Sequence, residues 1–453
     1  MKFQKPKFVT LLSIKKILLV WSLIFFCFVV QAQTNTTYGT NALPQTTGHR
    51  NSAFGYFAMQ NVTNSIITYD NTAIGYSTLV NVTGPYNTAV GSQSLTNNTS
   101  GEANTALGAY TLNENTTGSY NTAVGLLALQ FNSTGQYNSS LGYLSLSQNT
   151  IGEYNTAIGA QALNHNNAGI LNSGFGANAL YTTSSGSYNT AVGTNALFAN
   201  TIGGYNTATG VDALNSSTEG SYNTANGAYS LFTNTTGTDN TAMGYQTLNF
   251  NNTGNANSAF GKEALYHATG SDNTAIGFRA GYNNTGNGNL FMGKEAGANE
   301  TGNNKLYISG YVSNNNKTII YGDFSTGQVL LGRPNPTGYV FKGTRTLNVL
   351  GGIIADSVRV ALSNNWADYV FSDDYKLMPL EDLKNYVGAN KHLPNIPSAE
   401  EVKSNGIEVA DMNTKLLEKI EELHLYVLEQ QEQIKQQQKQ IDELKLLVAN
   451  KNR

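Results

Sequence analysis

The chain of 453 residues has few of the residue types on which enzyme and nucleic-acid sites depend. Its one cysteine, Cys27, lies in an N-terminal apolar stretch, so the rest of the chain has no disulfide and no thiol chemistry. Basic residues are also scarce over residues 33–303. This range contains only Arg50, Lys262, Arg279 and Lys294. Since binding to phosphates needs clustered cations, nucleic acid is not an expected partner.

Histidine is also sparse, and its positions predict no metal site. The five histidines are far apart in the sequence, at His49, His165, His267, His392 and His424. The chain shows neither a glycine-rich phosphate loop nor a recurring pair of carboxylates. We therefore expect no metal and no cofactor. We also expect no enzymatic activity, apart from one serine motif near the C-terminus.

The segment from Met1 to Ala32 has the pattern of a secretory signal peptide. Five lysines precede an apolar stretch over residues 17–30, and Ala32 offers a cleavage site before Gln33. The stretch is short for a membrane span, although an uncleaved anchor is the alternative. We expect a secreted or cell-surface chain with no transmembrane segment left after cleavage. Cleavage would take the formal net charge from −3 to −8, because the segment holds five lysines and no acidic residue.

The chain is rich in one repeated phrase, Asn-Thr-Ala-aliphatic-Gly. It recurs at a constant interval from Asn87 to Asn257, and at less regular intervals on both sides of that range. A short fixed period, here about 17 residues, indicates one structural unit stacked on itself. With the asparagine as position 1, position 4 is usually aliphatic, position 5 is glycine and position 9 is leucine. A polar turn that ends in glycine closes each repeat.

Such a repeat is too short for two packed helices, but it suffices for one coil of two short strands and two turns. We expect the side chains at positions 4 and 9 to point inward, and the glycines to supply positive φ or close backbone approach. Stacked coils would pair as parallel strands about 4.8 Å apart. The asparagines would then form an internal ladder. The predicted fold is mainly β, with a parallel β-roll or solenoid over residues 33–303.

Three further rows of side chains leave alternatives open. Tyrosine often precedes the asparagine, which predicts packing between coils or else an adhesive aromatic surface. Thr209 and Asn226 interrupt the aliphatic row and mark either a polar seam or a weak point. The threonines at position 2 also allow an ice-binding face. The tyrosines are Tyr86, Tyr120, Tyr137, Tyr154, Tyr188, Tyr205 and Tyr222.

Two kinds of structure are expected after the repeats. Residues 304–345 alternate like short strands and predict a β-rich neck. A heptad pattern over residues 412–453 predicts a coiled coil. Its β-branched a positions with leucine at d favour two strands, whereas Gln430 and Gln437 at d weaken that preference. The residues expected to hold the chains together are Leu416, Ile420, Leu423, Val427, Ile434, Ile441, Leu444 and Val448.

Residues 35–303 resemble the YadA-like β-roll head of trimeric autotransporter adhesins. The resemblance rests on the repeated phrase Asn-Thr/Ser-Ala-aliphatic-Gly. The repeat is longer than that family's more usual period, and the chain shows no translocator segment after the coiled coil. The resemblance implies three chains wound side by side, and heads that bind matrix or other surfaces. We therefore expect a homotrimer with an unknown extracellular ligand.

Residues 346–411 are expected to form a separate module, and residues 346–430 resemble the C-terminal module of tail-fibre-like proteins of the Bacteroidetes. The resemblance rests on Trp366, Asp368–Phe371, His392–Ser398 and Asn413–Leu423. More distantly, the module is similar to the intramolecular chaperone domain of phage endosialidases. In that family a Ser-Asp pair and a lysine at the fifth position after the serine support self-cleavage.

Self-cleavage is the one enzymatic activity that the sequence leaves open. Ser372 and Asp373 match the motif, but Lys376 stands at the fourth position after the serine instead of the fifth. A serine nucleophile needs the amine within hydrogen-bond reach. The shifted spacing favours a turn or a helix cap at Ser372 and Asp373.

Together these patterns predict a secreted or cell-surface fibrous adhesin-like protein that mediates attachment. Its C-terminal module and coiled coil would trimerise it. The alternative is a self-processing tail-fibre-like protein, whose C-terminal domain is a trimerisation chaperone and peptidase.

Overall fold

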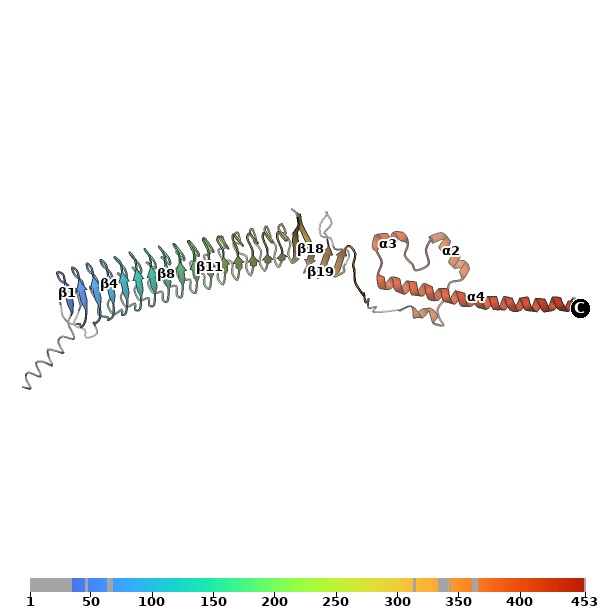
Figure 1. Cartoon of the computed structure of the whole chain (residues 1–453), viewed down its shortest axis with the longest axis horizontal. Helices are drawn as coiled ribbons and strands as arrows, with labels where there is room; N and C mark the ends of the chain where they lie inside the picture. Colours follow the sequence, from blue (N-terminus) through green and yellow to red (C-terminus); the bar gives the residue numbers. More distant parts are fainter. Residues whose placement is uncertain are drawn as a thin grey trace, which may run out of the picture. The chain divides into compact units, whose positions relative to one another are not determined.

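The computed structural model describes residues 35–44, 48–62, 68–312, 315–332, 341, 344–360 and 366–451. The predicted signal peptide and its cleavage site lie outside these residues. The chain divides into two compact units, of which the first ends at Gly352 and the second begins at Ile353. Figure 1 shows a stack of strands in the first unit and helices in the second.

The first unit is a solenoid whose successive turns, here called rungs, pair through short parallel strands. The parallel pairing continues from β1 to the start of β17 (Lys305–Val312). The short strands are β1 (Thr36–Tyr38), β2 (Ser52–Phe54), β3 (Thr72–Ile74), β4 (Thr88–Val90), β5 (Thr105–Leu107), β6 (Thr122–Val124), β7 (Ser139–Leu141), β8 (Thr156–Ile158), β9 (Ser173–Phe175), β10 (Thr190–Val192), β11 (Thr207–Thr209), β12 (Thr224–Asn226), β13 (Thr241–Met243), β14 (Ser258–Phe260), β15 (Thr274–Ile276) and β16 (Leu290–Met292). The predicted parallel solenoid is confirmed.

Each rung contains one strand, at positions 2 to 4, and the prediction of two strands is wrong. Positions 7, 9 and 17 adopt left-handed backbone conformations, as at Leu127, Leu129 and Tyr137, with φ of 61°, 50° and 56°. Residues in this region cannot continue a strand. Instead their N–H groups point along the stack. Leu129 donates to the carbonyl of Ser145 in the next rung at 3.0 Å, and Tyr137 donates to that of Ser119 in the previous rung at 3.1 Å.

The solenoid core consists of alanine at position 3 and leucine at position 9. Ala123 and Leu129 are both fully buried, and the same holds in most rungs. A leucine in the left-handed region is strained by about 1–2 kcal/mol. Burial of its side chain contributes about 1.5–3 kcal/mol, and its N–H group is hydrogen-bonded, so the arrangement is favourable.

The prediction that position 4 points inward is wrong. Side chains alternate between the two faces of a strand, so positions 2 and 4 face outward when position 3 faces inward. Leu141 is 50% exposed and Ile158 is 41% exposed. The interior selects alanine at position 3 because it is narrow. Even at Gly174, an added Cβ would lie 3.5 Å from the Leu163 side chain.

Two glycines in each rung serve the two purposes that the sequence predicts. Gly125, at position 5, has a φ of 130°, and a Cβ there would lie 2.5 Å from the carbonyl oxygen of Gly142 in the next rung. Gly118, in the closing turn, has no positive φ. A Cβ on this residue would lie 2.4 Å from the oxygens of Asn115 and Gly135. Close approach of successive rungs therefore excludes a side chain at both positions.

The asparagines at position 1 form the predicted internal ladder. The side-chain oxygen of Asn121 accepts hydrogen bonds from the backbone and side-chain amides of Asn138 at 3.0 and 3.1 Å. The Asn121 amide also donates to the carbonyl of Gly135 at 2.9 Å. Each buried amide is thus satisfied by the rungs on both sides, as a buried polar group requires.

A second asparagine ladder runs at position 12. The Asn132 amide donates to the Asn115 side chain at 2.7 Å and to the Gly135 carbonyl at 3.0 Å, so the two ladders meet at this carbonyl. The second ladder has defects where asparagine is replaced. The buried oxygens of Asn200 and Asn251 have no hydrogen-bond partner, because the next rungs carry Ser217 and Ala268. The side-chain oxygens of Thr183 and Ser217 are unsatisfied as well.

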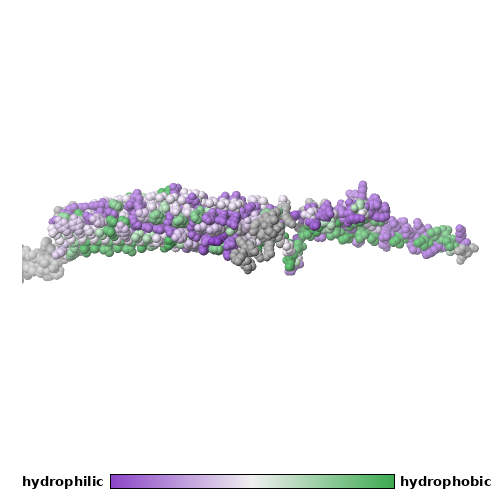
Figure 2. All heavy atoms as spheres, turned by 90° about the horizontal axis from the view of Figure 1, so that it is seen from above, coloured by the Kyte–Doolittle hydropathy of each residue, from purple (hydrophilic) through white to green (hydrophobic). Residues whose placement is uncertain are grey.

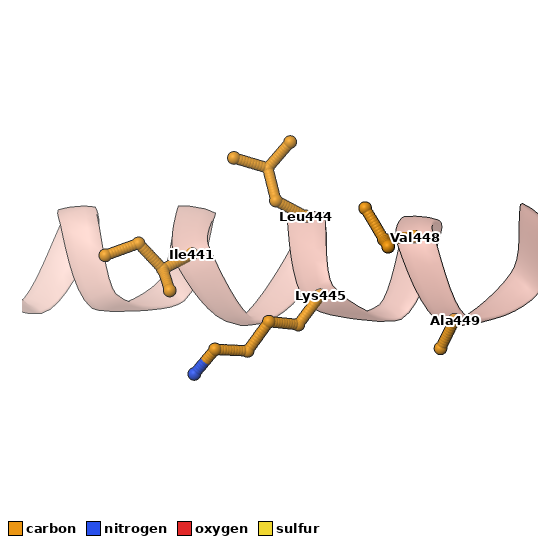
Figure 3. A pocket seen from close by; sticks show the side chains of 5 residues that line it. All are labelled: Ile441, Leu444, Lys445, Val448 and Ala449. Carbon is orange, nitrogen blue, oxygen red and sulfur yellow. The ribbon is translucent and has the colours of Figure 1, made fainter.

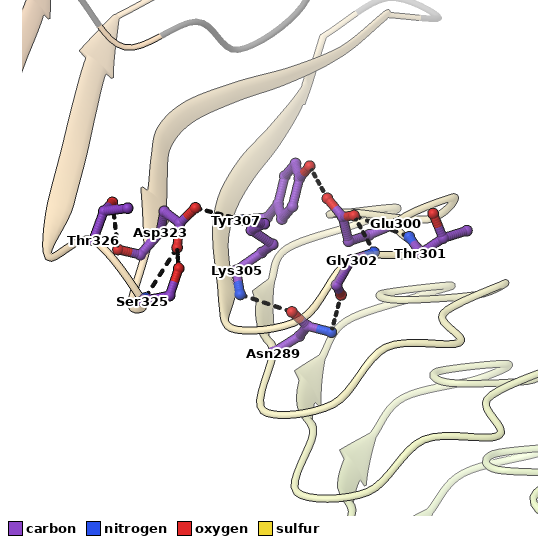
Figure 4. A network of polar contacts seen from close by, with 9 residues as sticks. All are labelled: Asn289, Glu300, Thr301, Gly302, Lys305, Tyr307, Asp323, Ser325 and Thr326. Carbon is purple, nitrogen blue, oxygen red and sulfur yellow. Dashed lines mark hydrogen bonds and ion pairs between the residues drawn. The ribbon is translucent and has the colours of Figure 1, made fainter. Parts of the chain in front are cut away.

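The regular rungs end at an antiparallel hairpin. β17 pairs with β18 (Asn315–Asp323), which pairs with β19 (Gln328–Gly332), and β19 pairs in parallel with β20 (Leu347–Leu350). The strands predicted for the neck are therefore present. Figure 4 shows the last step of the asparagine ladder, in which Asn289 accepts from the backbone of Lys305 at 2.7 Å. The Lys305 amine pairs with Asp323 at 2.5 Å and lowers the pKa of that carboxyl to about 2.

The second unit is helical. A 3-10 helix, η1 (Ala367–Phe371), is followed by α2 (Leu380–Asn390), α3 (Ala399–Asn405) and the long helix α4 (Val409–Lys451). Ser398 starts α3 through a capping box with Glu401, in which each side chain bonds the backbone of the other. The long helix confirms the helix expected from the heptad pattern.

The core assignment is tested by two substitutions in one rung. We expect Leu129→Ala to lower the free energy of unfolding by about 2–5 kcal/mol, because it leaves a cavity between rungs. Leu126→Ala removes the same atoms from a side chain that is 46% exposed, and should cost less than about 1 kcal/mol. Chemical denaturation followed by circular dichroism measures both. Equal losses would contradict the assignment.

The defects in the second ladder predict a stabilising substitution. In Ser217→Asn, the new side-chain NH2 group should donate to the unsatisfied oxygen of Asn200. The new side-chain oxygen should accept from the amide of Asn234. Because this removes buried unpaired groups, we expect a gain of about 1–3 kcal/mol in the free energy of unfolding. Ser216→Asn is the matched control on the neighbouring, half-exposed position. A gain from Ser216→Asn, or none from Ser217→Asn, would refute the role of the ladder.

Candidate functional site

The stacked parallel strands of the solenoid expose a row of hydrophobic side chains to solvent. Figure 2 shows a hydrophobic band along one edge of this unit. On the strands, the exposed side chains at position 4 form what we call the apolar lane: Phe54, Ile74, Leu107, Leu141, Ile158, Phe175, Val192, Met243, Phe260, Ile276 and Met292. The only polar side chains at position 4 between β2 and β16 are Thr209 and Asn226, both exposed. A row this long is typical of an interaction surface, since monomeric proteins rarely expose large apolar patches.

A second row, the tyrosine lane, consists of the exposed tyrosines at position 17 listed above. Three of them, Tyr120, Tyr137 and Tyr154, stack in parallel with ring centroids 5.0 and 4.8 Å apart. The predicted packing between coils is therefore present in this lane. Adhesion by these rings stays a prediction.

Three of the four basic residues in residues 33–303, Lys262, Arg279 and Lys294, lie near the C-terminal end of the solenoid. Glu263 is nearly buried and pairs with Arg279 at 2.5 Å and with Lys262 at 3.3 Å. The same cations lie over aromatic rings, with Lys262 5.6 Å from the ring centre of Tyr245. Burial alone would raise the pKa of Glu263, but the hydrogen bonds from Arg279 and Lys262 hold it below its usual value. The charges are therefore paired within the rungs and offer no open anion site.

In α4, every hydrophobic position of the predicted heptad seam is exposed. Leu416 is 45% exposed and Leu444 is 59% exposed, with the other seam residues between these values. Figure 3 shows a shallow apolar depression on the helix, lined by Ile441, Leu444 and Val448 together with Lys445 and Ala449. An isolated helix with a long apolar stripe is only marginally stable in water. Packing of that stripe against another element stabilises it.

The chain covers a different side of α4 with its own residues. Tyr369 and Tyr375 donate hydrogen bonds to Glu418 and Glu422, one turn apart on the helix. Tyr426, a further turn along, donates to the backbone of Met378 at 2.5 Å. These three helix residues occupy heptad positions f, c and g, away from the a and d seam. The segment that precedes α2 therefore leaves the seam open.

Lys419 completes a nearly buried ionic cluster on this side of the helix. Its amine lies 2.7 Å from Glu418 and 2.8 Å from Glu422. Burial alone would raise the pKa of Glu418, but hydrogen bonds from Lys419, Tyr369 and Asn395 outweigh it, and the pKa lies below its usual value. The hydrogen bond to Glu418, aided by burial, raises the pKa of Tyr369 to about 12.

The structure does not join the residues of the predicted self-cleavage motif. Ser372 follows η1, and its backbone N–H donates to the carbonyl of Tyr369 at 3.2 Å. The Ser372 hydroxyl donates to the carboxylate of Asp374 at 2.5 Å. Within residues 366–451, no hydrogen bond links Ser372 to Lys376 or to Asp373. The geometry resembles a turn with a local cap, and self-cleavage stays a prediction.

The ionic cluster on α4 was not predicted from the sequence. Its one signal is the regular spacing of Glu418, Glu422 and Tyr426, which places them on one side of a helix. That spacing alone also fits a solvated helix face. The partners Tyr369 and Tyr375 precede their carboxylates by 49 and 47 residues, and only the folded chain brings them there.

The chain is a mainly β parallel solenoid of repeats of about 17 residues, followed by C-terminal helices. No protein-family model, curated protein or solved structure matches it. In the described part of the chain, no three acidic, histidine or cysteine residues gather as a metal would require. None of the described helices combines the length and the apolar character needed to cross a membrane.

The ionic cluster predicts a pH dependence for the second unit. The pKa of Glu418 is lower in the folded chain than the ordinary glutamate value of about 4.3. Its ionised form therefore contributes to the free energy of unfolding above about pH 4.3, and this contribution is lost as the pH falls through the folded pKa. We therefore expect the segment around η1 to leave α4 in this acidic range. The fluorescence of Trp366 reports it, since the other tryptophan, Trp21, lies in the predicted signal peptide.

The matched control for this titration is Glu418→Gln. It keeps the size of the side chain and removes its charge, so the acid transition of Trp366 should weaken or disappear. The variant should also be less stable at neutral pH, because the amine of Lys419 loses one partner. An unchanged transition in the variant would show that another group controls it.

Proposed function

We propose that this protein is a homotrimeric extracellular fibre, with the solenoid as its head and α4 as its coiled-coil clamp, and that it serves in attachment to surfaces. The observation that carries the proposal is the exposed a and d seam of α4. Eight hydrophobic side chains at heptad spacing are exposed to solvent, while the segment that precedes α2 packs on another side of the helix. A second copy of the same helix is the partner that this spacing fits.

The second unit also has too little core to be stable alone. Among its described residues, 353–360 and 366–451, the only buried hydrophobic side chains are Ala367 and Val370. Neither α2 nor α3 contains a buried residue. A fold of this size normally needs a larger core, or else oligomerisation, to offset the entropy lost on folding. Self-association supplies that burial.

The apolar lane supports contact between chains in the head as well. Most rungs add one hydrophobic side chain to the lane at the same place, so copies of the solenoid side by side would bury a strip that only Thr209 and Asn226 interrupt. The number three comes from the resemblance to trimeric adhesin heads, since the heptads alone allow two or three chains.

Attachment is the role that this architecture favours over catalysis. The solenoid surface carries repeated rows of tyrosine, threonine and aliphatic side chains, and repeated rows suit multivalent contact with an extended target. Secretion, which the N-terminal signal pattern predicts, is consistent with such a role. The proposed ligand is a surface or matrix polymer of unknown identity.

Sedimentation equilibrium tests the clamp on residues 33–453. We expect the unaltered chain to be a trimer, and the double variant Ile434→Lys and Ile441→Lys to dissociate, because charges at two a positions cannot be buried without partners. The control is Gln436→Lys with Glu443→Lys, which places the same side chains at c positions. A monomer in the unaltered chain, or equal masses for both variants, would sink the proposed assembly.

The same variants test attachment. Beads coated with the trimer should be retained under flow on a basement-membrane matrix, and beads with the dissociated variant should be retained at least several-fold less, since avidity needs linked heads. The control variant should behave like the unaltered chain. If the trimer is not retained on this matrix, the proposed attachment to this class of target is wrong, while the proposed trimeric assembly is unaffected.

A further inference from the structure

Two groups of three tyrosines in the tyrosine lane have an arrangement that favours covalent coupling. Tyr120, Tyr137 and Tyr154 stack with interplanar angles of 3° and 6°. Tyr188, Tyr205 and Tyr222 stack with centroids 4.7 and 5.1 Å apart and angles of 4° and 5°. Leu171 occupies the same row between the two groups and separates them. Within each group, adjacent rings are therefore nearly parallel, with centroids no more than 5.1 Å apart.

These rings are also accessible to a reagent in solution. Their exposed fractions run from 44% for Tyr137 to 59% for Tyr222. They stand on left-handed turn residues outside the strands, so the side chains are not held in the core. The Tyr120 hydroxyl donates to the carboxylate of Glu102 at 2.8 Å, which gives its proton an acceptor when the ring is oxidised.

The repeats contain no cysteine with which to link their rungs. The only cysteine, Cys27, precedes the solenoid, so no disulfide can join its rungs. An extracellular solenoid without covalent links between its rungs opens most easily at its ends and at ladder defects such as Ser217. A bond between adjacent tyrosines would close a loop of one rung and restrict such opening.

We propose that the two stacked tyrosine groups are sites of oxidative cross-linking, in which adjacent rungs are joined by dityrosine bonds. The oxidant is hydrogen peroxide, used by a haem peroxidase. Each of two neighbouring phenols loses one electron and one proton, and the two phenoxyl radicals form a carbon–carbon bond between their ortho positions. The two ring hydrogens at those carbons then move to the oxygens, which restores both phenols. One peroxide molecule takes up two electrons and two protons and leaves as two molecules of water.

The geometry predicts which tyrosines couple. Tyr69 and Tyr86 meet at 84°, and Tyr229 and Tyr245 meet at 86° with centroids 6.2 Å apart, so neither pair has the parallel arrangement of the two groups. Tyr266 and Tyr282 stack at 5.0 Å but are only half-exposed, and they should react more slowly than the two exposed groups. Coupling in the lane should therefore join tyrosines of adjacent rungs within one chain.

The experiment is to treat the full chain with peroxidase and peroxide and to digest it with a glutamate-specific protease. Glu153 lies between Tyr137 and Tyr154, and Glu219 lies between Tyr205 and Tyr222. Uncoupled pairs are thus separated by cleavage, while coupled pairs stay joined and weigh two hydrogens less than the sum of their peptides. We expect both joined products, blue dityrosine fluorescence and an unchanged chain mass on a denaturing gel.

Two conservative variants serve as reciprocal controls. Tyr137→Phe should abolish the product that joins Tyr137 to Tyr154 and leave the product of the second group, and Tyr205→Phe should do the reverse. Tyr143→Phe, in which an exposed tyrosine outside the stacks is lost, should change neither product. Products that persist in the matching variant, join distant tyrosines or join separate chains would overturn the proposal, as would no coupling at all.

Discussion

The structure of the first unit depends on hydrogen bonds between rungs, above all on the asparagines at position 1. Each asparagine side chain bonds to the next rung and to the carbonyl that closes its own rung, so that one residue type fixes both the spacing and the register of the stack. The core alone could not do this. Alanine and leucine fill a narrow interior, but identical hydrophobic rungs would allow slippage, whereas a buried unpaired amide is costly.

A stack in fixed register turns each sequence position into a row on the surface. The apolar lane, the threonines and the tyrosine lane all arise in this way, and each would keep a spacing near that of paired strands over the whole solenoid. Single residues therefore matter less than rows, and a site on this unit is extended by its nature. This explains why the proposed contacts, with other copies of the chain and with a polymeric target, involve repeated side chains.

The second unit follows different rules, since it has little core and no repeat. Its segment around η1 is held to α4 by hydrogen bonds to a nearly buried pair of carboxylates, which a lysine of the same helix also contacts. The hydrophobic seam residues of the helix remain exposed to solvent. Such an ionic cluster specifies one side of the helix and stabilises it only modestly. The division of α4 into a covered side and an open seam is the strongest structural argument for self-association.

The sequence by itself determined the parallel solenoid, the leucine core, the roles of the glycines, the asparagine ladder and the long helix, because each follows from a period or a local conformational preference. It did not predict the direction of position 4, the single strand in each rung, the second asparagine ladder or the cluster around Glu418. Leucine and valine fit an interior and an interface equally well, and only the tertiary structure decided which positions the narrow core could accept. Contacts between segments far apart in the sequence have no period to reveal them, so the folded chain alone placed Tyr369 on α4.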